Sequence, residues 1–417
     1  MWKAVKWSLA GSVFAIVIAL SGVVGYTIAG DDGGGGATVI DRRAGDDGGY
    51  GILNEIQDVL EEDFVIPDAV DPENLQYGAI QGVIEALNDP HTVYITPEEY
   101  QSGIDIISGS FEGIGANVDQ DRTTGEIVIV APFRDSPAEK AGVLPGDVIL
   151  EVDGESTEGW TVGDAVERIR GPQGTVVTVV VRHQDRSTEE IAITRGTIVI
   201  PTVFSHDVTD AEGNTVPDLA YIELQQFTDQ AVQDLRQELT RITDEGYRGL
   251  ILDLRRNPGG GLDATVNIAD MFLDGGTVLT QVDRDGNQTV YEAESGGEAT
   301  EIPVVILVSN GSASGSEVLA GALRDHGRAQ LVGMQTFGKG SVNHLRELSN
   351  GGALYVTIAR WLTPNGELIE GVGLTPDVPV ELTPDQLSEE LQTGQGPQLY
   401  AAIDALQNAL AQAQTGR

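Results

Sequence analysis

Ser314 and Lys339 are the residues of this sequence whose types and spacing best suit nucleophilic chemistry. Ser314 follows the apolar run Val304–Val308, which has the pattern of a buried strand, and then a turn of small residues. A helical pattern, residues 317–324, comes next. A strand, a tight turn and a helix can lift a hydroxyl above a sheet while the helix N-terminus directs backbone N–H groups toward it. Ser314 is therefore our candidate nucleophile.

Lys339 is the candidate base. A serine hydroxyl attacks well only when a neighbouring base takes its proton, and Ser–Lys pairs recur as an alternative to Ser–His–Asp. A lysine can be that base when burial disfavours its charged form. Lys339 lies between two glycines with no local carboxylate, and only four of the 24 Lys and Arg residues are lysines. Arginine cannot serve as a base near neutral pH, which makes the position of this lysine informative.

Each of these residues also has an ordinary structural interpretation. Ser314 and Glu317 fit the S-x-x-E pattern of a helix capping box, and most such serines only cap a helix. Residues 338–340, Gly-Lys-Gly, fit a solvated turn. The pattern G-x-S-x-G does not apply, because Ala313 stands at its central position. From these residues alone, both the catalytic and the structural interpretations stay open.

Three histidines offer alternative chemistry. His326 lies twelve residues along the helical pattern from Ser314, about 18 Å at the standard rise and too far for proton transfer. His344 remains open as an alternative base to Lys339. His91 has no second metal ligand at helical or hairpin spacing, so we expect it to be an ordinary structural histidine.

Residues 311–317, 325–328 and 336–341 together resemble the active-site region of the C-terminal processing peptidases, also called tail-specific proteases. This family uses a serine nucleophile and a lysine base about 25 residues apart, and Ser314 and Lys339 match those two positions. The resemblance implies a serine endopeptidase that needs neither a metal nor an organic cofactor.

The resemblance also implies three supporting residues. Asn343 occupies the position at which the family usually has a glutamine that orients the lysine, and it carries the same amide on a shorter side chain. Residues 253–260, Asp-Leu-Arg-Arg-Asn-Pro-Gly-Gly, match the family's oxyanion turn. Gly260 and Gly315 are then the two expected donors of backbone N–H groups to the oxyanion. A glycine turn by itself is usually only a turn.

Residues 111–195 form short β patterns with Gly-Asp turns and resemble a PDZ domain. Such a domain binds an extended C-terminal peptide as an added strand, and loop amides capture the terminal carboxylate. Arg170, at the end of the helical pattern 162–170, either links peptide binding to the catalytic domain or caps its helix. The expected carboxylate loop comprises Phe111, Gly113, Ile114 and Gly115.

Composition excludes several classes of function. With 417 residues the chain is long enough for two or more domains. It has no cysteine, which excludes thiol catalysis, thiolate metal sites and disulfides. The formal net charge of −41 disfavours nucleic acids and anionic lipid headgroups as partners.

The N-terminus predicts a membrane anchor. Residues 8–30 carry no charge, and as a helix they would extend about 34 Å, enough to cross a bilayer. Lys3 and Lys6 precede this run, which favours a cytoplasmic N-terminus and an extracytoplasmic remainder. A cleaved signal peptide is the alternative, although no clear A-x-A exit follows.

Strand and helix patterns alternate from Leu219 onward, which is typical of an α/β core. We therefore expect a multidomain α/β protein, and the resemblance to the peptidase family implies a crotonase/ClpP-like protease core. The final helix, residues 398–413, fits either a subunit contact in a homo-oligomer or packing on the surface of the core. The expected divisions are an anchor (1–30), a linker (31–49), a helical region (50–105), a PDZ domain (106–196), the core (197–383) and a C-terminal helix with its tail (384–417).

The expected function is that of a membrane-tethered serine endopeptidase that recognises the C-terminal tails of proteins or peptides. The alternative is a PDZ adaptor that binds such tails and retains an inactive protease core.

Overall fold

A computed structural model of the chain describes residues 50–97, 99–100, 110–121, 124–133, 136–199 and 201–415. The predicted anchor and linker, residues 1–49, lie outside this range. No helix among the residues that it describes is both long and apolar enough to cross a membrane.

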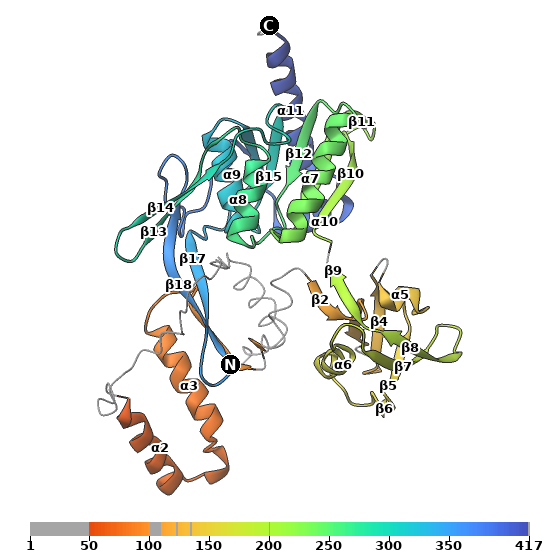
Figure 1. The fold of residues 1–417 in the computed structure, drawn as a ribbon, viewed down its shortest axis with the longest axis vertical. Helices are drawn as coiled ribbons and strands as arrows, with labels where there is room; N and C mark the ends of the chain where they lie inside the picture. The colour runs from red at the N-terminus through yellow and green to blue at the C-terminus, as the bar shows by residue number, and fades with distance from the viewer. Residues whose placement is uncertain are drawn as a thin grey trace, which may run out of the picture.

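The core is built on a six-stranded sheet in which β11, β12, β15, β16 and β19 run parallel and the edge strand β10 runs antiparallel to β11 (Figure 1). The central strands β12 and β15 are buried along their whole length, as their continuous apolar runs predict. The strands are β10 (Val203–Thr209), β11 (Thr215–Leu224), β12 (Gly249–Asp253), β15 (Val304–Val308), β16 (Ala329–Gly333) and β19 (Val378–Pro379).

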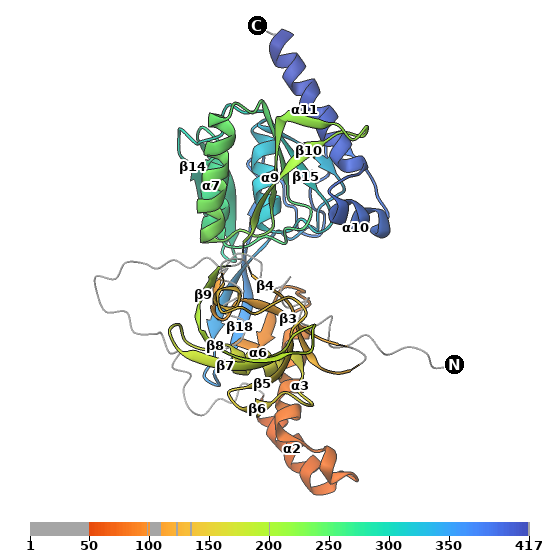
Figure 2. The same ribbon diagram turned by 90° about the vertical axis from the view of Figure 1, so that its right-hand side faces the viewer.

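Helices cover both faces of this sheet. Because strand side chains alternate in direction, Leu250 and Leu252 pack toward α7, α8 and α9, whereas Ile251 packs toward α11. The first turns of α11 pack on the sheet, whereas its C-terminal end projects beyond it, as Figures 1 and 2 show. The predicted packing on the core therefore applies to the first turns. A subunit contact through the projecting end stays a prediction. The helices are α7 (Asp229–Asp244), α8 (Leu262–Asp270), α9 (Gly315–Asp325), α10 (Pro384–Thr393) and α11 (Pro397–Thr415).

A second sheet joins the core to the N-terminal region. Its strand β18 pairs with β13 and β17 of the core and also with β1, through the register Val93↔Tyr355. This pairing places the segment after helix α3 directly against the strands that follow Lys339. The elements are α2 (Gly51–Asp63), the 3₁₀ turn η1 (Pro67–Ala69), α3 (Pro72–Glu85), β1 (Val93–Ile95), β13 (Gly276–Asp283), β14 (Gln288–Ala293), β17 (Ser341–Glu347) and β18 (Ala353–Leu362).

The small β domain has the sheet order β3-β4-β5-β7-β8, with two helices. Thr161 caps α6 through a capping box, as its place before the helical pattern predicts. The chain bends within the expected carboxylate loop: β2 ends at Gly113 and β3 begins at Ala116, and Gly115 between them has a φ of +74°. The elements are β2 (Ser110–Gly113), β3 (Ala116–Gln120), β4 (Ile127–Pro132), α5 (Pro137–Lys140), β5 (Val148–Val152), β6 (Glu155–Ser156), α6 (Val162–Ile169), β7 (Val176–Arg182), β8 (Thr188–Thr194) and β9 (Gly196–Val199).

Candidate active site

The site lies where the neighbouring parallel strands β12 and β15 end, because the turns that follow them meet at the same edge of the sheet. Serine hydroxyls that the sequence analysis did not single out fasten these two turns together. Buried donors of this kind satisfy carbonyl groups that would otherwise lack partners. The hydrogen bonds run from Ser309 to the carbonyl of Arg255, from Ser312 to that of Leu254 and from Ser316 to that of Asn257, at 2.8, 2.8 and 2.7 Å.

Ser314 directly precedes α9 in an unusual conformation. Its backbone has φ 51° and ψ −113°, and such geometry costs on the order of 1–3 kcal/mol in a residue other than glycine. Its side chain is fully buried, and its Oγ has no hydrogen-bond partner among the described residues. The carboxylate of Glu317 does accept the Ser314 N–H, at 2.9 Å. The Glu317 N–H donates to the backbone carbonyl of Ser314 at 2.8 Å, so the Ser314 hydroxyl remains available for chemistry.

Glu317 connects the backbones of the candidate nucleophile and the candidate base. Its Oε2 accepts the backbone N–H groups of both Ser314 and Lys339, each at 2.9 Å. Its Oε1 accepts the N–H of Gly338 at 2.7 Å and the hydroxyl of Thr336. Burial raises the pKa of Glu317, and these four hydrogen bonds partly offset that effect. The sequence suggested only a capping role for this carboxylate.

The amine of Lys339 is buried in the core. The Lys339 side chain is itself buried, and its Nζ is 5.6 Å from the centroid of the Tyr355 ring. Burial lowers the pKa of Lys339 to about 8, against the opposing influence of the carboxylates of Glu370, Glu317 and Asp89. A substantial fraction of this amine is therefore neutral near pH 8, as a general base requires.

Ser314 Oγ and Lys339 Nζ do not hydrogen bond to each other in this conformation, because each lacks a partner among the described residues. A buried polar group left unpaired costs about 1–3 kcal/mol. Catalytic hydrogen bonds are often absent or long before a substrate binds. Two buried groups that each await a hydrogen-bond partner therefore fit a site that is completed by its substrate.

Asn343 does not contact the amine that it was predicted to orient. Its Nδ2 donates to the carbonyl of His91 at 2.9 Å and to Thr357 Oγ1 at 3.1 Å, and its Oδ1 accepts from Ser341 at 3.2 Å. It thus holds the N-terminal segment against β17 and β18. An orienting role for Asn343 toward Lys339 stays a prediction.

The two predicted oxyanion donors lie near each other. A Cβ built at Gly315 would be 3.5 Å from the amide nitrogen of Gly260, and one built at Gly259 would be 2.9 Å from that of Gly315. Such an approach of the two turns is possible only without side chains. This arrangement is compatible with a pair of donors to one oxyanion, which stays a prediction.

Gly260→Ala is expected to lower kcat by about 100-fold, the usual effect of losing one oxyanion donor. Gly260 has φ +156°, and a Cβ there would be 2.2 Å from the carbonyl oxygen of Phe227, so the turn must shift. Peptide hydrolysis measured under saturating substrate tests this effect. Gly261→Ala is the matched control, because its Cβ would have no neighbour closer than 3.8 Å. Equal rates for the two variants would contradict a donor role for Gly260.

A buried ionic network holds the start of the turn that carries Gly260. Although burial pushes the pKa of Asp253 upward, the guanidinium of Arg255 beside it holds that pKa below its ordinary value. Arg255 also donates to Glu390 of α10 at 2.8 Å and to Gln398 of α11 at 3.2 Å. Tyr221 donates its hydroxyl hydrogen to Asp253. The C-terminal helices are thereby tied to the turn that carries Gly260.

None of the three histidines singled out in the sequence shares a hydrogen bond with Ser314 Oγ or Lys339 Nζ. His326 ends α9, and its Nε2 contacts the carbonyl of Thr277 at 2.8 Å. His344 is on β17, where burial and then the charge of Arg346 lower its pKa. His91 Nε2 is 3.0 Å from Glu370 Oε1. Across the described ranges, His, Asp and Glu form no group suited to a metal ion.

The predicted peptide-binding residues lie on one side of the small β domain. Phe111 and Gly113 belong to β2, and Ile114 and Gly115 connect it to β3. β3 is an edge strand with α6 beside it, the arrangement that allows a peptide to be added as a strand. Arg170 is the residue that ends α6.

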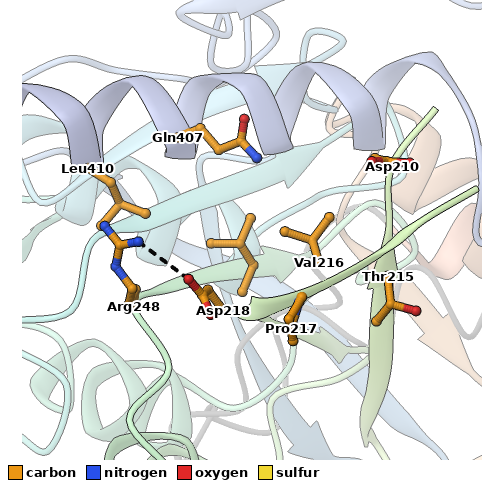
Figure 3. Close-up of a pocket in the computed structure, with 9 residues that line it drawn as sticks. Asp210, Thr215, Val216, Pro217, Asp218, Arg248, Gln407 and Leu410 are labelled. Carbon is orange, nitrogen blue, oxygen red and sulfur yellow. Dashed lines mark hydrogen bonds and ion pairs between the residues drawn. The ribbon is translucent and has the colours of Figure 1, made fainter. Parts of the chain in front are cut away.

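A depression of about 330 Å³ lies at the N-terminal ends of the parallel strands, away from the candidate site (Figure 3). It lies where β11 and β12 begin, and an ion pair of 3.3 Å between Arg248 and Asp218 crosses it. Because the sheet is parallel there, this place is a strand length away from Ser314, and the depression is not part of the candidate site.

Two protein families match parts of the chain. Peptidase family S41 matches residues 218–380, and the PDZ domain family matches residues 128–183. The first match contains the turns and the loop that carry Ser314, Gly260 and Lys339.

Two curated relatives and one solved structure are similar over most of the chain. The carboxy-terminal processing protease CtpA of Bacillus subtilis is 37% identical over 331 residues, which cover 79% of this chain and 68% of the relative. The carboxyl-terminal-processing protease of Synechocystis is 37% identical over 80% of this chain and 78% of its own length. The photosystem II D1 C-terminal processing protease aligns over 81% of this chain and 95% of that protein, with 30% identity and a TM-score of 0.47.

Proposed function

Because this chain belongs to peptidase family S41, we propose that it cleaves proteins with Ser314 as nucleophile and Lys339 as general base. The chain is a C-terminal processing serine peptidase with a PDZ domain. The observation that carries the residue assignment is the buried, unpartnered amine of Lys339, whose backbone shares the carboxylate of Glu317 with Ser314.

The acylation step follows from these groups. Neutral Lys339 Nζ takes the proton of Ser314 Oγ while that oxygen bonds to the carbonyl carbon of the substrate. The carbonyl electron pair moves to its oxygen, which the N–H groups of Gly260 and Gly315 stabilise. When the C–N bond breaks, the Lys339 ammonium returns its proton to the leaving amine, and the acyl group stays on Ser314.

Water then releases the product. The neutral amine of Lys339 takes a proton from a water molecule, whose oxygen attacks the acyl carbon. The second tetrahedral intermediate expels Ser314 Oγ, which recovers its proton from the lysine. Each proton leaves and returns through the same amine, so the proposed cycle needs no metal or organic cofactor.

The PDZ domain is proposed to recognise the C-terminal tail of the substrate. The open edge of β3 supports this, as does the bend at Gly115, where a Cβ would approach Ser136 and Ile198 within 2.8 Å. Glycine is favoured at this positive φ and at this close approach, and loops of this kind can direct their backbone amides at a terminal carboxylate. Binding the tail there would concentrate upstream peptide bonds near Ser314.

Residues 8–30 are proposed to anchor the chain in a membrane with the peptidase outside the cytoplasm, supported by their uncharged length and by the lysines before them. Sequencing of the mature N-terminus tests the anchor. A chain that begins after residue 30 would identify a cleaved signal peptide instead.

The proposed activity is tested with the purified full chain and an unfolded protein that ends in an apolar tail. Wild type is expected to cleave it and Ser314→Ala only to bind it. Binding without cleavage by wild type, across several tails, would instead identify an adaptor.

Amidation of the substrate's C-terminus is expected to raise KM about tenfold or more and to change kcat little. A hydrogen bond to a charged carboxylate contributes about 1.5–3 kcal/mol, and the amide loses that charge. Initial rates for the same peptide with free and amidated ends measure the effect. Equal KM values would show that the tail carboxylate is not recognised.

A further inference from the structure

The loop that carries the base is held by carboxylates along its backbone. Three successive N–H groups donate to them: Gly338 and Lys339 to Glu317 at 2.7 and 2.9 Å, and Gly340 to Glu370 Oε2 at 2.9 Å. Gly340 also packs directly on Glu370, since a Cβ there would be 2.7 Å from the Glu370 amide nitrogen. The two carboxylates thus clasp the loop from opposite ends.

Glu370 has a second partner far away in the sequence. Its Oε1 is 3.0 Å from Nε2 of His91, and both side chains are largely buried, with 22% and 14% exposed. A carboxylate accepts hydrogen bonds, so His91 donates from Nε2 here. One side chain therefore connects the base loop to the segment that precedes β1.

Hydrogen bonds of residues 89–92 hold the backbone around His91 in place. Asp89 Oδ1 accepts the His91 N–H at 3.1 Å, and the His91 carbonyl accepts from Asn343 at 2.9 Å. Thr92 Oγ1 donates to Asp89 at 2.6 Å and accepts the Thr357 N–H at 3.2 Å. Residues 89–92 are consequently docked on β17 and β18, with the imidazole of His91 against Glu370.

We propose that Glu370, held by His91, is a positioning residue for Lys339: it secures the Gly340 end of the base loop, and its negative charge governs how readily the amine loses its proton. This inference deepens the proposed function and rests on it. Lys339 then has its proper pKa only when residues 89–92 are docked on β17 and β18.

Electrostatics gives Glu370 a distinct role among the groups around the amine. Among the described residues, the carboxylates of Glu370, Glu317 and Asp89 act on the Lys339 amine electrostatically, in that order, and the ring of Tyr355 lies 5.6 Å from its Nζ. Glu317 is occupied by four internal donors, whereas Glu370 serves one amide and one imidazole. A nearby negative charge favours the ammonium, so removing that of Glu370 should favour the neutral amine.

Glu370→Gln is the direct test, because it removes the charge while the amide oxygen still accepts from Gly340 and the NH₂ group donates to Nε2 of His91 once the imidazole proton moves to Nδ1. The Lys339 pKa of about 8 in wild type is expected to fall by about one unit. Lysine labelled with ¹³C at Cε reports it in the full chain, which has only four lysines, and Lys339→Met identifies the signal. The pH midpoint of kcat/KM should move by the same amount.

His91→Ala should shift that midpoint in the opposite direction. Without the imidazole donor, the charge of Glu370 is less dispersed and stabilises the ammonium more, so the midpoint should rise by about half a unit. Glu367→Gln is the matched control: it removes a carboxylate of the same segment that pairs with Arg324, and it should leave the midpoint unchanged. If Glu370 and His91 only stabilised the fold, both variants would have lower kcat/KM, but its pH midpoint would not shift in opposite directions.

The outcomes separate this inference from the proposed function. An unshifted Lys339 signal in Glu370→Gln overturns the inference even if wild type cleaves its substrate. A shifted signal supports it even if no substrate is cleaved, in which case the proposed function fails instead. Should Glu370→Gln not fold, the upward shift in His91→Ala decides, and its absence overturns the inference.

Discussion

Replacing Lys339 with alanine is expected to reduce kcat by at least about 10⁴-fold, because it removes the proposed base, the one buried lysine among the described residues. Single-turnover hydrolysis of the tail-bearing substrate measures the loss. His344→Ala is the control: its imidazole lies on β17 outside the site, and substantial activity should remain. Loss of activity in His344→Ala together with an active Lys339→Ala would exchange the two assignments.

The same position provides a test of folding that does not depend on activity. The Lys339 pKa is about 8 in the folded chain, against an ordinary value of 10.5, so the unfolded state binds more protons between these pH values. Stability therefore rises with pH through this window, and below about pH 8 the buried amine costs roughly 3 kcal/mol of the free energy of unfolding. Lys339→Met removes that cost and should be inactive with an unfolding midpoint no lower than that of wild type.

Glu317→Gln is expected to lower kcat by about 100-fold or more and to destabilise the chain by about 3 kcal/mol. Both carboxylate oxygens accept two hydrogen bonds each, from Ser314 and Lys339 on one side and from Gly338 and Thr336 on the other. A glutamine has only one acceptor oxygen, so its NH₂ group would face two donors. The loop and the nucleophile turn would then separate.

Denaturant unfolding and kcat, measured on the same preparation, test this second expectation. Glu367→Gln, on the surface side of the same region, should change neither quantity appreciably. A Glu317→Gln variant with the stability and rate of wild type would show that another contact holds the base loop.

Local patterns in the sequence were sufficient for the elements that carry the chemistry. The apolar runs of β12 and β15, the glycine turn near Gly260 and the small-residue turn before α9 each predict their structure within a few residues. The type of chemistry likewise follows from residue identity, since a serine and a rare lysine limit the possible bases. The confirmed parts of the prediction, the peptidase family and the PDZ domain, rest on several such motifs in order.

Contacts between distant residues could not be predicted in this way. Glu317 was interpreted as a cap, and only the folded chain brings residues 336–339 to its carboxylate. Asn343 was assigned to Lys339, yet its amide binds the carbonyl of His91, 252 positions away. The sequence contains no sign of this contact, because it depends on the pairing of β1 with β18.

The sequence by itself determined which groups can react, because nucleophilicity and basicity belong to residue types and short patterns place them on turns. Only the tertiary structure decided whether the lysine loses its charge and what surrounds it. Burial and the carboxylates of Glu317 and Glu370 set that balance. Strand pairing and packing between residues far apart in the sequence bring these groups together. The energies of such contacts are sums over many atoms and leave no local signature in the sequence.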